Sequence, residues 1–226
     1  MPAGDRKRAG TGGYVKMKTE VHASCRPYFT TRRMATIALL SAISIVMSIV
    51  PGIGFIYVGV IKATFMHIPV IIAAITEGPV AGAIVGLIFG ISSLVINMSG
   101  PLAPVFINPL VSVAPRIMIG LSAAYTYKAL KHVSNCGSKN NSKSGKICAI
   151  ISVPAAAAVG TIMNTAGVLG MIYVVAAREF TQVKGVTMAN LGRILAGVAL
   201  TNGVAELVVA VVLVTAIIKG INTIRK

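Results

Sequence analysis

Six long apolar runs, separated by short polar connections, occupy the chain between Met34 and Ile218. The hydrocarbon core of a bilayer is about 30 Å thick and needs about 20 apolar residues per helical crossing. Only helices and closed barrels satisfy their backbone polar groups in lipid, and this sequence lacks the ~10-residue alternating strands of a barrel. We therefore predict an all-α, polytopic membrane protein with six transmembrane helices. The predicted spans are 34–50, 55–76, 79–97, 105–129, 147–175 and 188–218.

The composition agrees with a membrane location and fixes a simple domain organisation. Only 12% of the 226 residues are charged, whereas soluble domains carry about 25%. We predict a basic, disordered tail at 1–33, one substrate-binding membrane domain at 34–218 and a short C-terminal tail at 219–226. The longest polar stretch inside the membrane domain, 131–146, is expected to be a flexible loop.

The placement of the positive charge predicts an orientation. The net charge is +16, and sixteen of the 21 lysines and arginines fall in three regions: the N-terminal tail, the connection after the fourth span and the C-terminus. Two fall in the connections on the opposite side, and three lie within the spans. Cytoplasmic connections carry the excess of lysine and arginine, so both termini are expected in the cytoplasm of a plasma-membrane protein. The membrane orientation therefore accounts for the net positive charge, and no nucleic-acid partner is expected.

Polar side chains inside the spans are the candidate functional residues, because an ionisable group in the bilayer needs a partner or a water-filled cavity. In the fourth span Asn108, Ser112 and Arg116 are spaced four apart, which in a continuous helix forms one polar stripe. The sixth span holds Asn202 and Glu206 with the same spacing. The remaining intramembrane ionisable residues are Lys62, His67 and Arg193.

Two interpretations of Arg116 follow from the sequence. Arg116 pairs with Glu206 and holds the bundle together, or it lines a pocket that opens outward and binds an anion. The spans contain three cations and one carboxylate, so one ion pair would still leave an excess of positive charge. This excess favours an anionic ligand held by Arg116, Lys62 or Arg193. His67 is expected either to pack between helices or to line the same site.

Catalytic and cofactor-binding patterns are missing from the sequence. Three scattered histidines do not give the spacing of a metal site. The stretch GSKNNSKSGK lacks the first glycine of a phosphate-binding loop, so ATP binding by this chain is not expected. We predict a protein that is not an enzyme and that holds no metal or cofactor.

Small residues at four-residue spacing mark two helix-packing surfaces. The first span carries Ala38 and Ala42, and the third carries Gly82, Gly86 and Gly90. Such spacing lets another helix backbone approach closely. Packing inside the bundle and docking of another membrane protein are both consistent with this spacing. The first span, which often lies at the periphery of a bundle, is the better docking candidate.

Three stretches together carry a resemblance to a known family: HIPVIIAAITEGPVAGAIVGLIFGISSLVIN, PLAPVFINPLVSVAPRIMIGL and NGVAELVVAVVL. They resemble the substrate-binding S component of an energy-coupling factor (ECF) vitamin transporter. The resemblance implies six helices that bind a micronutrient from outside and then dock onto a transmembrane coupling protein with two ATP-binding subunits. It implies docking through Ala38 and Ala42, and a site in the outer halves of the later helices.

The chemistry of the spans suggests the ligand class. The chain has no tryptophan and is 5% aromatic, which disfavours a stacking platform for a flavin or thiamine ring. A small carboxylate vitamin such as pantothenate fits the surplus of positive charge best, followed by folate or another anionic vitamin. The expected substrate-binding residues are Lys62, Asn108, Ser112, Arg116, Arg193 and Asn202. The alternative function is a small gradient-driven carrier or channel that works without ATPases.

Overall fold

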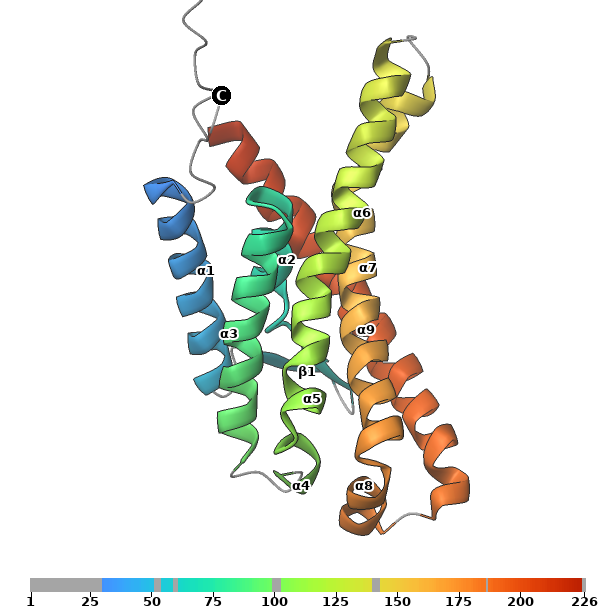
Figure 1. Cartoon of the computed structure of the whole chain (residues 1–226). Helices are drawn as coiled ribbons and strands as arrows, with labels where there is room; N and C mark the ends of the chain where they lie inside the picture. Colours follow the sequence, from blue (N-terminus) through green and yellow to red (C-terminus); the bar gives the residue numbers. More distant parts are fainter. Residues whose placement is uncertain are drawn as a thin grey trace, which may run out of the picture. The chain divides into compact units, whose positions relative to one another are not determined.

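The fold is given by a computed structural model that describes residues 30–50, 54–58, 61–98, 103–139, 143–185 and 187–224 (Figure 1). Along the chain the elements are α1 (Thr31–Ile49), β1 (Phe55–Val58), β2 (Ile61–Thr64), α2 (Ile68–Thr76), α3 (Pro79–Asn97), α4 (Ala103–Phe106), α5 (Pro109–Ser112), α6 (Ala114–Lys139), α7 (Lys143–Val175), α8 (Ala177–Lys184) and α9 (Met188–Ile224).

The short helix α2 lies at the centre of the bundle. Every residue from Ile68 to Ile75 is buried, and the helix contacts α1, α3, α6, α7 and α9. A helix that is apolar all round can be stable only where other elements surround it. Around it, α3 packs on α6, α6 on α7 and α7 on α9, while α1 lies against α2 and α3 (Figure 1). The largest cluster of buried apolar residues gathers around this central helix.

The structure corrects the predicted helical span 55–76. Its first half is a β-hairpin in which β1 and β2 run antiparallel, with Tyr57 opposite Lys62. The two strands read FIYV and IKAT, rich in the β-branched and aromatic residues that favour strands. Pro69 stands in the first turn of α2, where its missing N–H is not needed. That proline would break a helix running through from residue 55, so the helix begins at Ile68.

The predicted polar stripe of the fourth span is also wrong, because 105–129 is not one helix. The chain forms α4 and α5, of four residues each, before α6 begins at Ala114. Asn108 caps α5, its side-chain oxygen accepting the backbone N–H of Leu110 at 3.1 Å. Pro109 and Pro115 each stand in the first turn of a helix, where proline is tolerated. Pro115 therefore lies at the beginning of α6 and does not kink a longer helix.

Among the described residues, four helices are long and apolar enough to cross a membrane: α1, α3, α9 and residues 147–175 of α7. The predicted count of six is therefore not reached by this measure. The nine residues of α2 span only about 14 Å at 1.5 Å per residue. The 26-residue helix α6 is long enough but becomes polar in its second half. The helices also extend into the expected loop 131–146, since α6 ends at Lys139 and α7 begins at Lys143.

The glycines of α3 form the internal seam that their spacing allowed. A Cβ atom added to Gly86 would lie 2.4 Å from the backbone oxygen of Arg116, and one on Gly90 would lie 2.9 Å from Cα of Val113. Gly82 and Gly120 are in similarly close contact across the same seam. The glycines thus bring the backbones of α3 and α6 together, and packing inside the bundle is confirmed as their role.

An ion pair joins the start of α1 to the turn before α3. Glu77 ends α2, and Gly78, with φ of 98°, turns the chain into α3 in a conformation that favours glycine. Arg33 Nε lies 3.1 Å from the Glu77 carboxylate, and its Nη2 donates to the Glu77 backbone oxygen. Glu77 therefore has a structural role, because it joins α1 to this turn.

Candidate functional site

A cavity of about 360 Å³ lies between the end of α1, the strand β2 and the helices α3, α4, α6, α7 and α9. This volume falls within the range of small-molecule pockets, ~300–1,000 Å³. The lining residues are Ser48, Thr64, Met66, His67, Phe89, Ser93, Ile96, Asn97, Phe106, Arg116, Asn164, Thr165, Val168, Leu169, Val198, Asn202 and Glu206.

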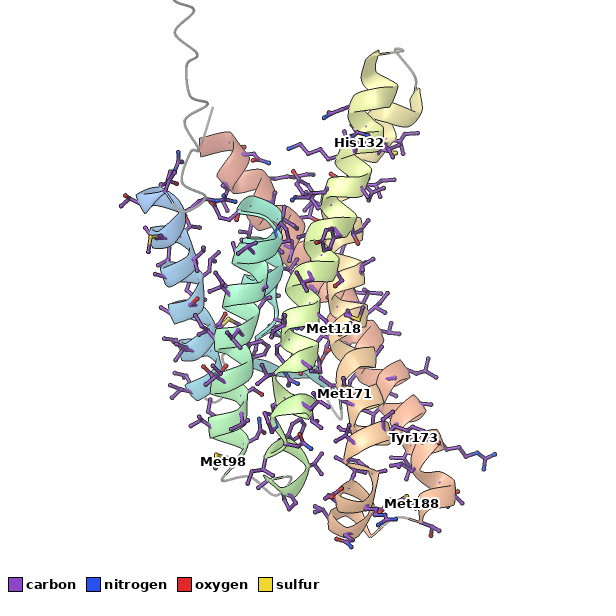
Figure 2. All side chains as sticks on the ribbon, viewed as in Figure 1. Met98, Met118, His132, Met171, Tyr173 and Met188 are labelled. Carbon is purple, nitrogen blue, oxygen red and sulfur yellow. The ribbon has the colours of Figure 1, made fainter. Side chains whose placement is uncertain are left out.

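The cavity lies toward one end of the bundle. Met98, directly after α3, and Met188, at the start of α9, lie at the end that carries α4, α5 and α8, whereas His132 of α6 lies toward the other end (Figure 2). The cavity is lined by the last residues of α3 and by the beginning of α6. It therefore belongs to the half of the bundle nearer to α4 and α5.

Arg116 is the cation that lines the cavity from α6, and it is buried, with 8% of its surface exposed. Its Nη1 donates to the backbone oxygen of Val111 at 3.2 Å, and its Nη2 to the hydroxyl of Ser93 at 3.4 Å. The guanidinium carbon lies 5.7 Å from the centre of the Phe89 ring, close enough for a cation–π interaction. Its Nε has no hydrogen-bond partner in the described part of the chain. Since a guanidinium has five N–H donors, Arg116 keeps donors for an anion in the cavity.

Glu206 is the carboxylate that lines the same cavity from α9, and it is also buried. One oxygen accepts the backbone N–H of Thr64 at 2.9 Å, and the other accepts the hydroxyl of Thr165 at 3.4 Å. Glu206 thereby connects three elements that are distant in sequence: the hairpin, α7 and α9. Glu206 and Arg116 do not form an ion pair, so the structure does not support the interpretation in which they hold the bundle together as a pair.

His67 lies at the inner wall of the cavity and is fully buried. Its Nε2 is 3.1 Å from the hydroxyl of Thr161 on α7, while its Nδ1 has no hydrogen-bond partner among the residues that the structure describes. The histidine therefore combines both roles considered from the sequence: it packs between helices, and it lines the site.

The six expected substrate-binding residues divide between the cavity and its surroundings. Arg116 and Asn202 line it. Ser112 lies behind it and donates to the backbone oxygen of Phe106, a lining residue, at 2.8 Å. Asn108 caps α5, and Arg193 is exposed on α9 away from the cavity. Lys62 belongs to β2, and its side chain lies outside the described part of the chain.

Several lining residues were not singled out from the sequence. Asn97, Asn164 and Thr165 are polar residues within otherwise apolar spans, and that position was the available signal. Ser93 has no such signal, since a serine in a membrane helix commonly bonds its own backbone. Its contact with Arg116 depends on how closely α3 and α6 approach each other.

Comparison with known proteins assigns the family. The family described as the substrate-specific component of ECF transporters matches residues 32–218, nearly the whole described part of the chain. The chain belongs to this family. The S component is also 27% identical over 182 residues to the pantothenic acid transporter PanT of Lactococcus lactis subsp. cremoris (strain MG1363). That alignment covers 73% of this chain and 80% of PanT.

Membership confirms the family resemblance found in the sequence. The S component is a transporter subunit and not an enzyme, and its long apolar helices agree with a membrane location. The cavity described above is then its candidate substrate site. No group of three histidine, cysteine or acidic side chains that could hold a metal occurs in the described part of the chain.

Proposed function

We propose that this S component captures a small anionic vitamin, with pantothenate as the best candidate, and delivers it through an ECF importer. Its partners would be a transmembrane coupling protein and two ATP-binding subunits. The similarity to a pantothenic acid transporter supports this substrate, and the excess of lysine and arginine supports cytoplasmic termini. With that orientation the cavity lies in the outer half of the membrane, where a vitamin arrives from outside.

The observation that carries the proposal is the buried guanidinium of Arg116 in the wall of the cavity. Among the described residues it makes two hydrogen bonds, one of them to a neutral serine, and no carboxylate there pairs with it. A buried charge without a counter-ion is costly, and a carboxylate ligand would supply the missing negative charge. Apolar atoms make up most of the exposed lining of the cavity as a whole, as expected where polar groups orient a small ligand.

The test measures pantothenate binding to purified protein by isothermal titration calorimetry. Loss of a hydrogen bond to a charged group costs about 1.5–3 kcal/mol. Arg116→Ala should therefore raise Kd by roughly 10- to 150-fold. Arg193→Ala, which removes an exposed arginine from α9, is the matched control and should bind like the wild type.

Arg116→Lys separates a loss of binding from a loss of folding, because it keeps the charge but not the planar array of donors. It should bind more weakly than the wild type while unfolding at a similar temperature. A folded Arg116→Ala protein with unchanged affinity would contradict the role proposed for Arg116. A wild-type protein that does not bind pantothenate would contradict the proposed substrate.

We further propose that α1 docks onto the coupling protein through Ala38 and Ala42. Both residues are exposed, and Leu39, Val46 and Ile49 extend the same exposed side of the helix. The opposite side, with Ser41, Ser44 and Ser48, is buried against the bundle. Small residues on the outward face let a partner helix approach closely.

Leucine at both alanine positions should reduce co-purification of the coupling protein and ATP-binding subunits, since its larger side chain keeps the helices apart. Pantothenate binding to the isolated S component should not change. Ala216→Leu, which changes another exposed alanine on α9, is the control and should assemble normally. Normal assembly of the Ala38 and Ala42 variants would refute docking at this face. Uptake without any ATP-binding subunit would instead indicate a gradient-driven carrier.

A further inference from the structure

Two side chains of opposite charge line the cavity from different elements and do not contact each other. Arg116 on α6 is held by Ser93 of α3 and by the backbone of Val111. Glu206 on α9 is held by Thr64 of β2 and by Thr165 of α7. Arg116 and Glu206 share none of these hydrogen-bond partners, so the cavity has a cationic region and a separate acidic region.

The acidic region can accept further hydrogen bonds. An ionised carboxylate offers about four lone-pair positions. Glu206 accepts the N–H and the hydroxyl of Thr64 and the hydroxyl of Thr165, which leaves about one lone-pair position for a donor from a ligand. Asn202 lines the cavity one helical turn before Glu206, and Asn164 precedes Thr165. These amide side chains add uncharged polar groups to the same cavity wall, which suit hydroxyls or an amide N–H of a ligand.

A second carboxylate on the ligand would instead be repelled in the acidic region, because Glu206 carries the same charge. In a buried site, like charges brought together repel each other strongly enough to reject the wrong ligand. Among the lining residues with described side chains, Arg116 is the one lysine or arginine, so no second cation would offset that repulsion.

We propose that Glu206 determines substrate specificity. The ligand binds with its own carboxylate at Arg116 and its hydrogen-bond donors at Glu206. Glu206 thereby rejects ligands that are negatively charged at both ends. This inference rests on the proposed function as the binding subunit for a small anionic vitamin. Pantothenate meets the requirement, because it carries one carboxylate at one end and two hydroxyls at the other.

The test compares two ligands on two forms of the purified protein by calorimetry. The ligands are pantothenate and its analogue in which the terminal primary alcohol is oxidised to a carboxylate. The wild type should bind the dicarboxylate at least about 100-fold more weakly. Glu206→Gln keeps an oxygen for the Thr64 N–H and should fold. It should bind pantothenate about 3- to 10-fold more weakly and reduce the discrimination to about tenfold or less. Glu179→Gln on α8 is the matched control and should leave both affinities unchanged.

The outcomes separate this inference from the proposed function. If the wild type binds pantothenate and the dicarboxylate equally well, the inference is wrong while the proposed function stands, and no variant is needed to decide. The same holds if Glu206→Gln keeps the full discrimination of the wild type. If the wild type binds neither compound, the proposed substrate is wrong and the inference fails with it.

Discussion

The close contact between α3 and α6 at Gly86 offers a quantitative test of how the site is built. Replacing Gly86 by alanine would place a Cβ atom 2.4 Å from the backbone oxygen of Arg116 and 3.0 Å from its carbonyl carbon. Ordinary van der Waals contact begins near 3.4 Å, so the two backbones must separate by about 1 Å. The contact is with backbone atoms, and no flexible side chain can move aside to relieve it.

The separation should affect both stability and binding. Overpacking of this kind costs about 1–3 kcal/mol. For a chain of this length that corresponds to a decrease of roughly 2–12 °C in the unfolding temperature. Arg116 would also move away from Ser93, and their hydrogen bond is already long at 3.4 Å. We therefore expect weaker pantothenate binding in the fraction of Gly86→Ala protein that remains folded.

The measurement is thermal unfolding in detergent together with calorimetric titration of pantothenate. Gly220→Ala on α9 is the matched control, because an added Cβ atom there meets nothing within 4 Å. That variant should keep the wild-type unfolding temperature or exceed it slightly, since alanine favours helices over glycine. If Gly86→Ala has the same stability and affinity as Gly220→Ala, the close approach of α3 and α6 at Arg116 is refuted.

Two further predictions concern single contacts. Ser93→Ala removes the hydroxyl that accepts from Arg116 and should raise the pantothenate Kd about 3- to 10-fold, whereas Ser92→Ala, whose hydroxyl bonds the Ile88 backbone of its own helix, should not. Equal affinities in a titration of the two variants would argue against a role for Ser93 in orienting Arg116. Glu77→Gln weakens the ion pair with Arg33 and should lower the unfolding temperature by about 1–4 °C, since a partly exposed pair contributes up to about 1 kcal/mol. An unchanged unfolding temperature at low salt would show that the pair adds no stability.

The class of the fold could be predicted because it depends on the length and polarity of the runs. The third span was placed at 79–97, the bounds of α3, since Pro79 and Gly78 mark its beginning. The hairpin was missed because FIYV and IKAT are apolar enough to extend a helical run, and hydropathy does not separate buried strands from helices. The length of the central helix α2 was overestimated for the same reason.

The site was predicted in part, and the errors have a common physical cause. Arg116 and Asn202 stood out as polar residues in apolar spans, and both line the cavity. Asn108 and Ser112 were added by assuming one continuous helix, which the capping of α5 and the start of α6 at Ala114 break. The positions of Ser93 and Thr64 depend on contacts between elements distant in sequence. Helical periodicity carries no information about such contacts.

The first helix links the cavity to the proposed docking face. Ser48, near its end, lines the cavity, while Ala38 and Ala42 lie on its exposed side. The pair of Arg33 and Glu77 holds the beginning of this helix against the turn before α3. A substitution that tilts α1 would therefore change both the cavity wall and the docking face. For this reason the Ala38 and Ala42 variants are informative only when ligand binding is measured on the same preparation, since lost assembly with intact binding localises the defect to the outer face.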